Sequence, residues 1–286
     1  MVDHRCGTRL GAEIARAAPE GGDSVVAAAR DPRKLPDDLR RHDRVLGVRL
    51  DVTRGAEITA AVEAALRRFG TIDVLVNTAG RGLLGAREEI TDTEARSLFD
   101  LNVFGLINVT RAVLPVMRAA GAGKIAHIGS RSGCEGEPGA SMYCASKFGV
   151  AGIGEALAAE LAPFGIQSMV VGPGVFRTDF LDGSSLSTAE RRIPAYDGTP
   201  AHATLDWIGT ADHAQLGDPV KGAALIHEAV RRTGCPGAWP WAATRQSANW
   251  PRCAAFRTTS RPGGRGPRPR PATTPPDRPG ATRRYV

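Results

Sequence analysis

Residues 44–77 read "RVLGVRLDVTRGAEITAAVEAALRRFGTIDVLVN" and decide the fold of this 286-residue chain. The apolar run over residues 44–52 predicts a buried strand. Residues 57–70 follow with apolar positions at helical spacing and a final glycine, which predicts a helix. A second apolar run, residues 72–77, predicts another strand. Strand, helix and strand of these lengths form a βαβ unit, whose two strands lie parallel in one sheet.

The same alternation continues on both sides of this unit. Further strands are predicted at residues 24–29, 123–130 and 166–174, and helices at 92–120, 141–165 and 218–234. Thr91 and Gly121 suit the two ends of the helix over 92–120. Repeated βαβ units predict an α/β fold with one doubly wound parallel sheet, of the Rossmann-like type. Ligands of such folds bind beyond the carboxyl ends of the strands.

Charge is unevenly distributed along the chain. The net charge is +7, but residues 235–286 alone carry +9, with ten arginines, no lysine and one acidic residue. We therefore predict one domain over residues 1–234 and an irregular or disordered Arg/Pro-rich tail over 235–286. The same composition fits a GC-rich gene read in a shifted frame. It also fits an arm that binds nucleic acid, which we do not favour.

Cysteine use and hydropathy bear on the location of the protein. The five cysteines are scattered without a C-x-x-C pair, and the first 30 residues lack the apolar core of a signal peptide. We find no run of roughly 18 apolar residues, so we expect no membrane span. These features predict a cytoplasmic protein, and we expect no metal site.

The stretch "YCASK" carries the chemistry. It places Tyr143 and Lys147 four residues apart, on one face of the predicted helix. A nearby ammonium favours the phenolate and lowers the pKa of the phenol, so that the tyrosine can exchange a proton near neutral pH. Chance pairing on a helix is the alternative. Ser130, at the end of a predicted strand, is placed to hold a substrate oxygen, and Ser132 competes with it.

Asn102 lies inside the predicted helix over 92–120. Asparagine is a poor residue in a helix interior unless its amide is used. Its amide then serves either the site or a buried backbone group.

These residues together resemble the short-chain dehydrogenase/reductase family over residues 4–234. The resemblance includes "YCASK", the serine thirteen residues before its tyrosine, and the asparagine in "LNVFG". It also includes "LDVT" (50–53), "GPGVFRT" (172–178) and "NTAG" (77–80), where Thr78 replaces the second asparagine of the family's N-N-A-G.

The resemblance implies an NAD(P)-dependent oxidoreductase that acts on an alcohol or ketone. Tyr143 would be the general acid and base, and Lys147 would tune it and bind the nicotinamide ribose. Ser130 would orient the reacting oxygen, and Asn102 would hold a water that links Lys147 to solvent. The implied cofactor-binding residues are Gly11, Arg30, Asp51, Val52, Asn77, Ala79, Gly80, Tyr143, Lys147, Pro173, Gly174 and Thr178.

The N-terminal region departs from the family. Its phosphate-binding turn, T-G-x-x-x-G-x-G, falls on "HRCGTRLG" (4–11), where arginines stand at the first two glycine positions and only Gly11 matches. Three residues precede this turn, so we expect the first strand to be truncated and the sheet to be open at its centre. A misread N-terminus and a degenerate protein both explain this. The alternative function is therefore a catalytically impaired relative that has lost cofactor binding.

Arg30 directly follows the strand over 24–29, where a positive charge suits the 2′-phosphate of NADP. We therefore favour NADP over NAD, although the adjacent Asp31 argues the other way. Residues between Thr178 and Asp218 would cover the site and select the substrate, and their apolar side chains suggest a moderately apolar alcohol or ketone. We expect at most a homodimer, paired through the helices over 92–120 and 141–162.

Overall fold

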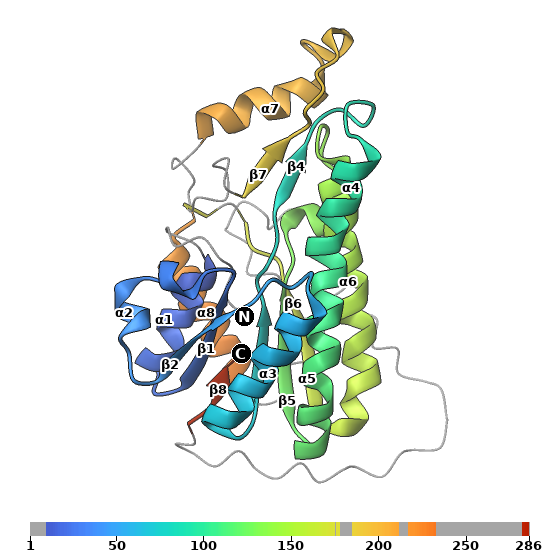
Figure 1. Ribbon diagram of the computed structural model, residues 1–286. Helices are drawn as coiled ribbons and strands as arrows, with labels where there is room; N and C mark the ends of the chain where they lie inside the picture. Colours follow the sequence, from blue (N-terminus) through green and yellow to red (C-terminus); the bar gives the residue numbers. More distant parts are fainter. Residues whose placement is uncertain (1–9, 175, 178–184, 212–216, 233–281, 286) are drawn as a thin grey trace, which may run out of the picture.

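In the part of the chain that the structure describes, six parallel strands form the central sheet (Figure 1). The structure is a computed structural model that describes residues 10–174, 176–177, 185–211, 217–232 and 282–285. The strand order is β2-β1-β8-β3-β5-β6, and every neighbouring pair is parallel. The strands are β1 (Ser24–Ala29), β2 (Val45–Arg49), β3 (Val74–Asn77), β5 (Gly123–Ile128), β6 (Ile166–Val171) and β8 (Arg284–Tyr285). The predicted doubly wound parallel sheet is confirmed.

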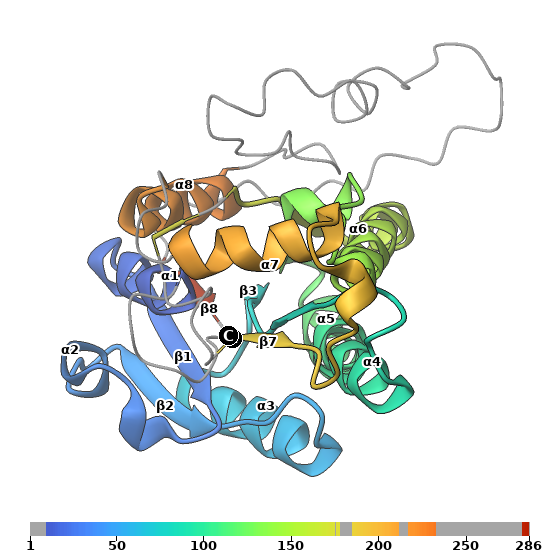
Figure 2. The same ribbon diagram turned by 90° about the horizontal axis from the view of Figure 1, so that it is seen from above.

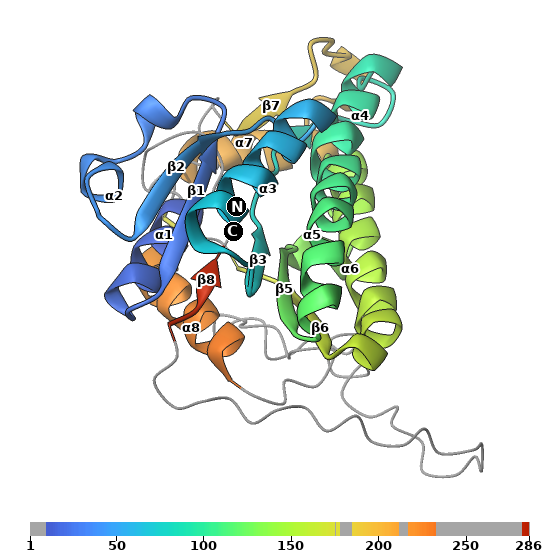
Figure 3. The ribbon, with the colours of Figure 1, turned by 60° about the horizontal axis from the view of Figure 1, so that its bottom comes forward.

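Helices cover both faces of the sheet (Figures 2 and 3). One face carries α1 (Leu10–Glu20) and α8 (Pro219–Arg231), and the other carries α3 (Gly55–Phe69), α5 (Leu106–Ala120) and α6 (Ser141–Leu161). A short helix, α2 (Asp37–Arg40), lies beside β2.

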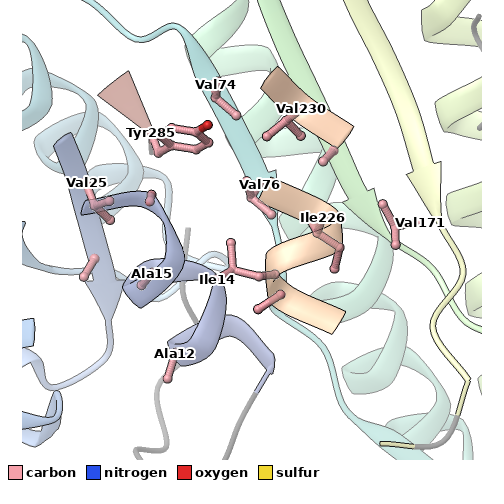
Figure 4. Close-up of a cluster of buried hydrophobic side chains, with 14 of the residues drawn as sticks. Ala12, Ile14, Ala15, Val25, Val74, Val76, Val171, Ile226, Val230 and Tyr285 are labelled. Carbon is pink, nitrogen blue, oxygen red and sulfur yellow. The ribbon is translucent and has the colours of Figure 1, made fainter. Parts of the chain in front are cut away.

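The apolar run of β1 follows from burial on both faces. Val25 and Ala27 pack into the cluster under α1 and α8, which Figure 4 shows, whereas Val26 and Ala28 pack into the cluster under α3 and α5. A strand buried on both sides is apolar at every position rather than at alternate ones.

The centre of the sheet differs from the prediction. Instead of an open gap, β8 lies between β1 and β3 and runs parallel to both. Its two residues, Arg284 and Tyr285, belong to the segment for which we predicted an irregular tail. Residues 1–9 and 233–281 lie outside the described residues, and with them lie the altered turn positions Arg5 and Arg9. In the described part of the chain, the sheet is thus completed by the C-terminal segment.

The predicted helix over 92–120 has the expected ends but an irregular middle. It consists of α4 (Asp92–Phe99), a π-helical stretch (Asp100–Gly105) and α5. Thr91 forms a capping box with Glu94, and Gly121 ends α5 with a φ of 64°. At Gly105, a Cβ atom would lie 2.5 Å from Cγ2 of Val52. The π-helical stretch therefore approaches the loop after β2 more closely than any larger residue would permit.

By length and composition alone, the helix over Asp92–Ala120 could cross a membrane. In this structure its apolar face is part of the domain core, where Val109, Val113 and Met117 are fully buried. Core helices of this kind pass the same test of length and hydropathy.

A small second layer lies beyond the carboxyl ends of the strands (Figure 1). It contains the parallel pair β4 (Gly82–Leu84) and β7 (Leu186–Thr188), together with α7 (Pro200–Ala211). Glu89 and His202 are buried within it, and Glu89 Oε1 lies 2.9 Å from His202 Nε2. Its elements β7 and α7 belong to the segment between Thr178 and Asp218 that we expected to cover the active site, whereas β4 comes from the loop after β3.

Candidate active site

Tyr143 and Lys147 lie on the first two turns of α6, at the carboxyl edge of the sheet. The Lys147 ammonium nitrogen is 5.9 Å from the centre of the Tyr143 ring. It donates a hydrogen bond of 2.9 Å to the carbonyl oxygen of Ile128, the last residue of β5. The side chain of Lys147 is buried, with 6% exposed. The i, i+4 spacing thus brings a phenol and an ammonium together inside the protein, as predicted.

Burial dominates the protonation of this pair. It raises the pKa of Tyr143 to about 12, against a lowering contribution from the hydrogen bond with Ser130. It also lowers the pKa of Lys147 to about 8. The pKa of Tyr143 is thus raised and not lowered as we expected, because desolvation by burial is the largest contribution. The phenol accordingly keeps its proton at neutral pH and is ready to donate it.

The structure separates the two candidate serines. Ser130 forms a side-chain hydrogen bond with Tyr143, and its Oγ also accepts from the backbone nitrogen of Ser132. Ser132 is buried, and its hydroxyl donates to Glu137 at 3.3 Å. Ser130, and not Ser132, therefore shares the site with the phenol.

Asn102 is buried in the π-helical stretch and joins two parts of the site. Its Oδ1 accepts from the backbone nitrogen of Arg81, and its Nδ2 donates to the carbonyl oxygen of Arg81, both at 2.9 Å. The same Nδ2 lies 3.1 Å from Oγ of Ser146. The amide thus serves buried backbone groups, which was the alternative explanation for an asparagine here. The predicted water link to Lys147 stays a prediction.

Two residues that were not predicted from the sequence, Ser146 and Arg81, also belong to the site. The hydroxyl of Ser146 donates to the carbonyl oxygen of Tyr143 at 2.7 Å and accepts from Asn102. A serine in the middle of a helix, directly before the lysine, was the available signal, because such a hydroxyl often bonds to the preceding turn. Arg81 contacts Asn102 through its backbone atoms only, so its side-chain type could not have indicated this role.

The loop after β3 forms the floor of the site. A Cβ atom on Gly80 would lie 3.3 Å from Oδ1 of Asn102 and 3.6 Å from the Lys147 ammonium nitrogen. Gly80 therefore meets both residues, and Ala79 precedes it, half-buried. The side chain of Asn77 instead points into the core, with Nδ2 3.1 Å from both the Thr110 hydroxyl and Nδ1 of His127. Its amide serves the fold.

The residues predicted to contact the adenosine end follow β1 and β2. Burial pushes the pKa of Asp51 upward, but hydrogen bonds from Thr53 and the charge of Arg30 lower it below its ordinary value. Arg30 is exposed, and Val52 is buried against Gly105. Asp31 is paired with Arg33, whose Nε lies 2.8 Å from its carboxylate.

Four further positions were predicted to bind the cofactor, and the structure describes three of them. Gly11 is buried in the first turn of α1, and Pro173 and Gly174 follow β6. Thr178 lies outside the described residues. Among the described residues there is no group of three or more metal-binding side chains.

The nicotinamide half of a dinucleotide fits the residues present. Within the described part of the chain, the Lys147 ammonium has one hydrogen bond, to Ile128, and a buried ammonium can make three. The remaining donors suit hydroxyl groups such as those of a ribose. Gly80 leaves space above Asn102 and Lys147 that a side chain would fill.

Replacing Lys147 by methionine is expected to stabilise the fold. The lowering of its pKa from 10.5 to about 8 corresponds to about 3 kcal/mol of unfolding free energy at pH 7. After loss of the bond to Ile128, a net gain of about 2 kcal/mol remains. Between pH 8 and pH 10.5 the lysine loses its proton in the folded chain but keeps it in the unfolded chain, so the wild-type chain becomes more stable as the pH rises. The difference in stability between Lys147→Met and the wild-type chain therefore shrinks over this range. Urea unfolding at pH 7 and pH 10 measures this; a variant less stable at pH 7 would contradict it.

The known proteins that this chain resembles in sequence are dehydrogenases, reductases and other oxidoreductases. The "short chain dehydrogenase" family matches residues 6–188. Oxidoreductase BOA17 of Botryotinia fuckeliana is 40% identical over 179 residues, which are 62% of this chain and 65% of that protein. A 3-ketodihydrosphingosine reductase of Bacteroides thetaiotaomicron is 39% identical over 178 residues, 62% of this chain and 64% of that protein. The chain thus spans just under two thirds of the length of these curated relatives.

Solved structures agree with this group. A short-chain dehydrogenase from Streptomyces avermitilis is 37% identical, with a TM-score of 0.73 over 83% of this chain and 86% of that one. A 3-ketoacyl-(acyl-carrier-protein) reductase from Brucella melitensis, complexed with NADH, is 25% identical with a TM-score of 0.66, over 83% and 93% of the two chains. ElxO with NADP bound, at 23% identity, shares the fold, with a TM-score of 0.67 over 83% and 94%. The arrangement of Ser130, Tyr143 and Lys147, together with these matches, shows that this chain belongs to the short-chain dehydrogenase/reductase family.

Proposed function

We propose that this chain is an NAD(P)-dependent oxidoreductase that interconverts an alcohol and a ketone. The observation that carries the proposal is the placement of Tyr143, Lys147 and Ser130 together at the carboxyl edge of a parallel sheet. Ligands of such sheets bind at this edge. A bound nicotinamide would supply the hydride acceptor or donor.

The chain's own residues handle the proton. Ser130 orients the substrate oxygen, and Tyr143, whose pKa burial raises to about 12, donates its proton to that oxygen during reduction. Lys147 places a positive charge 5.9 Å from the phenol ring, which stabilises the phenolate as it forms. Asn102 holds the loop at Arg81 against α6 and so keeps the floor of the site in position.

NADP is the favoured cofactor. Arg30 is exposed at the end of β1, where the 2′-phosphate would lie. The neighbouring carboxylate of Asp31 accepts two side-chain hydrogen bonds from Arg33, at 2.8 and 3.0 Å. Its charge is thereby offset, which weakens the argument for a ribose hydroxyl at this position.

Titration with NADPH and NADH, monitored by nucleotide fluorescence, tests whether the chain binds a nicotinamide cofactor and whether it prefers NADP. We expect saturable binding of NADPH, and about tenfold weaker binding after Arg30→Ala, because a charge-assisted hydrogen bond is worth about 1.5 kcal/mol or more. Binding of NADH should change little. Arg67→Ala, an exposed arginine on α3 paired with Glu63, serves as the control. Absence of binding at millimolar nucleotide would favour the impaired relative instead.

The substrate and the assembly are further proposals. We favour a moderately apolar alcohol or ketone, held beneath the layer of β4, β7 and α7. A homodimer would use the helices already named: Phe104 in the π-helical stretch is 53% exposed, and Phe148 on α6 is 41% exposed. The cytoplasmic location stays a prediction.

A further inference from the structure

The slot between β1 and β3 receives β8 through backbone pairing on both sides. Ser24 lies opposite Arg284, and Tyr285 lies opposite both Val25 and Val74. The backbone nitrogen of Ser24 donates to the carbonyl oxygen of Arg283 at 2.8 Å, and that of Asp73 donates to the carbonyl oxygen of Arg284 at 3.0 Å. A very short segment thus pairs with two strands at once.

Two carboxylates recognise the backbone of this segment. Asp23 and Asp73 directly precede β1 and β3. The backbone nitrogen of Arg283 donates to Oδ1 of Asp23 at 2.6 Å, and that of Arg284 donates to Oδ2 of Asp73 at 2.8 Å. Burial opposes ionisation of Asp23, but hydrogen bonds from His227 and Arg283 and the charge of Arg231 lower its pKa overall. The Asp23 carboxylate is paired with Arg231 at 2.6 Å, and burial raises the pKa of Asp73, so the two carboxylates act on the segment mainly as acceptors for its backbone nitrogens.

Side chains of the segment add to this recognition. The Arg284 guanidinium lies 3.8 Å from Asp73, and that of Arg283 donates to the carbonyl oxygen of Val230 at 3.1 Å. Tyr285 is 3% exposed and fills an apolar space lined by Val25, Val74 and Val230, visible in Figure 4. Its ring centre lies 5.5 Å from that of His227.

Among the residues that the structure describes, those of the slot that contact the segment precede residue 233. They belong to the starts of β1 and β3 and to α8, and 50 residues of sequence, 233–282, separate α8 and Arg232 from Arg283. Within the described part of the chain, the recognition thus involves the slot and three residues of the segment, Arg283 to Tyr285. Extended peptides are commonly bound by addition to a sheet in this way, with backbone bonds supplying affinity and a side-chain pocket supplying specificity.

We propose that the slot between β1 and β3 is a peptide-binding site for an extended strand with two basic residues before an aromatic one. The chain's own C-terminal segment occupies the slot, and a separate peptide of the same pattern binds there when that segment is weakened. This inference goes beyond the proposed oxidoreductase function, and its test uses no cofactor.

The test uses the full-length chain with Tyr285→Ala, and Tyr285→Phe as the matched control that keeps the buried ring. Truncation of a buried aromatic residue should lower Tm by about 10 °C, whereas Tyr285→Phe should change it little. A synthetic peptide of residues 280–286, "GATRRYV", at about 1 mM should recover several degrees for Tyr285→Ala only. In the wild-type chain the tethered segment competes at a comparable effective concentration. The same peptide with alanine for tyrosine should have no effect.

A second chain keeps the proposal testable if Tyr285→Ala does not fold. Ser24→Cys with Arg284→Cys places two thiols at opposed positions of β1 and β8. Oxidation should join them within one molecule, as peptide mapping would show. The proposal is overturned by a cysteine pair that stays reduced or that joins two molecules. It is equally overturned if Tyr285→Ala folds and the peptide neither raises its Tm nor binds saturably by anisotropy.

Discussion

Tyr143→Phe is expected to lower kcat/KM for alcohol oxidation or ketone reduction by about 10²- to 10⁴-fold, the usual contribution of a positioned general acid or base. The phenol is the proton donor beside Ser130, and its pKa, raised to about 12 by burial, keeps it protonated in the resting protein. Phenylalanine keeps the ring and its packing but cannot donate. Steady-state rates with NADPH and a panel of apolar ketones measure the loss.

Nucleotide binding separates this effect from damage to the fold. Tyr143→Phe should bind NADPH as tightly as the wild-type chain, because Lys147 and the floor at Gly80 are unchanged. Ser132→Ala is the matched control, since Ser132 bonds to Glu137 and not to the phenol. Its kcat/KM should fall far less. Equal turnover by Tyr143→Phe and wild type would exclude Tyr143 as the proton donor.

His202→Ala is expected to destabilise the protein by about 3 kcal/mol, the cost of leaving a buried carboxylate without a hydrogen-bond donor. His202 is fully buried, with Nε2 2.9 Å from Glu89 and Nδ1 3.0 Å from Asp197. Glu89 is 2% exposed and also accepts from the backbone nitrogens of Ala86 and Ile193. Alanine at position 202 would leave the Glu89 carboxylate buried without its main side-chain donor. Urea unfolding at pH 7 measures the loss.

Acid should weaken the same cluster in the wild-type chain. Burial alone would raise the pKa of Glu89, but hydrogen bonds from Ile193, Ala86 and His202 lower it below its ordinary value of 4.5. A lowered carboxyl pKa stabilises the fold above pH 4.5, and that stability is lost as the pH falls further.

Tyr196→Phe is the control for His202→Ala, because it removes an exposed hydrogen bond to Glu88 in the same layer and should cost under about 1 kcal/mol. A loss for His202→Ala no larger than this would refute the prediction.

Periodicity predicted most of the sheet because its signals are local. The run at Ser24–Ala29 is apolar throughout, as a strand covered on both faces requires, and glycines at 70 and 121 end their helices with positive φ. The spacing in "YCASK" likewise placed Tyr143 and Lys147 on one helix face. Ser130 was distinguished from Ser132 only by the turn that follows β5, which directs their side chains to different partners.

Local signals could not predict effects that depend on residues far apart in the sequence. The π-helical stretch depends on Asn102 bonding to Arg81 and on Gly105 meeting Val52, contacts that span 21 and 53 positions. The raised pKa of Tyr143 depends on how much water the fold excludes, so the i, i+4 charge alone suggested the wrong direction. The irregular tail was predicted from composition, and composition cannot indicate that Arg284 and Tyr285 pair with β1 and β3.

The amino-acid sequence by itself determined the alternation of strands and helices, the parallel sheet and the membership of Tyr143, Lys147 and Ser130 in one site. Each of these follows from spacing along a single helix or from the order of neighbouring elements. Only the tertiary structure decided which strand completes the centre of the sheet. Arg284 and Tyr285 pair with β1 and β3 because Asp23 and Asp73 meet their backbone and a shared core buries the tyrosine. Contacts across more than 200 residues exist only once the chain has folded.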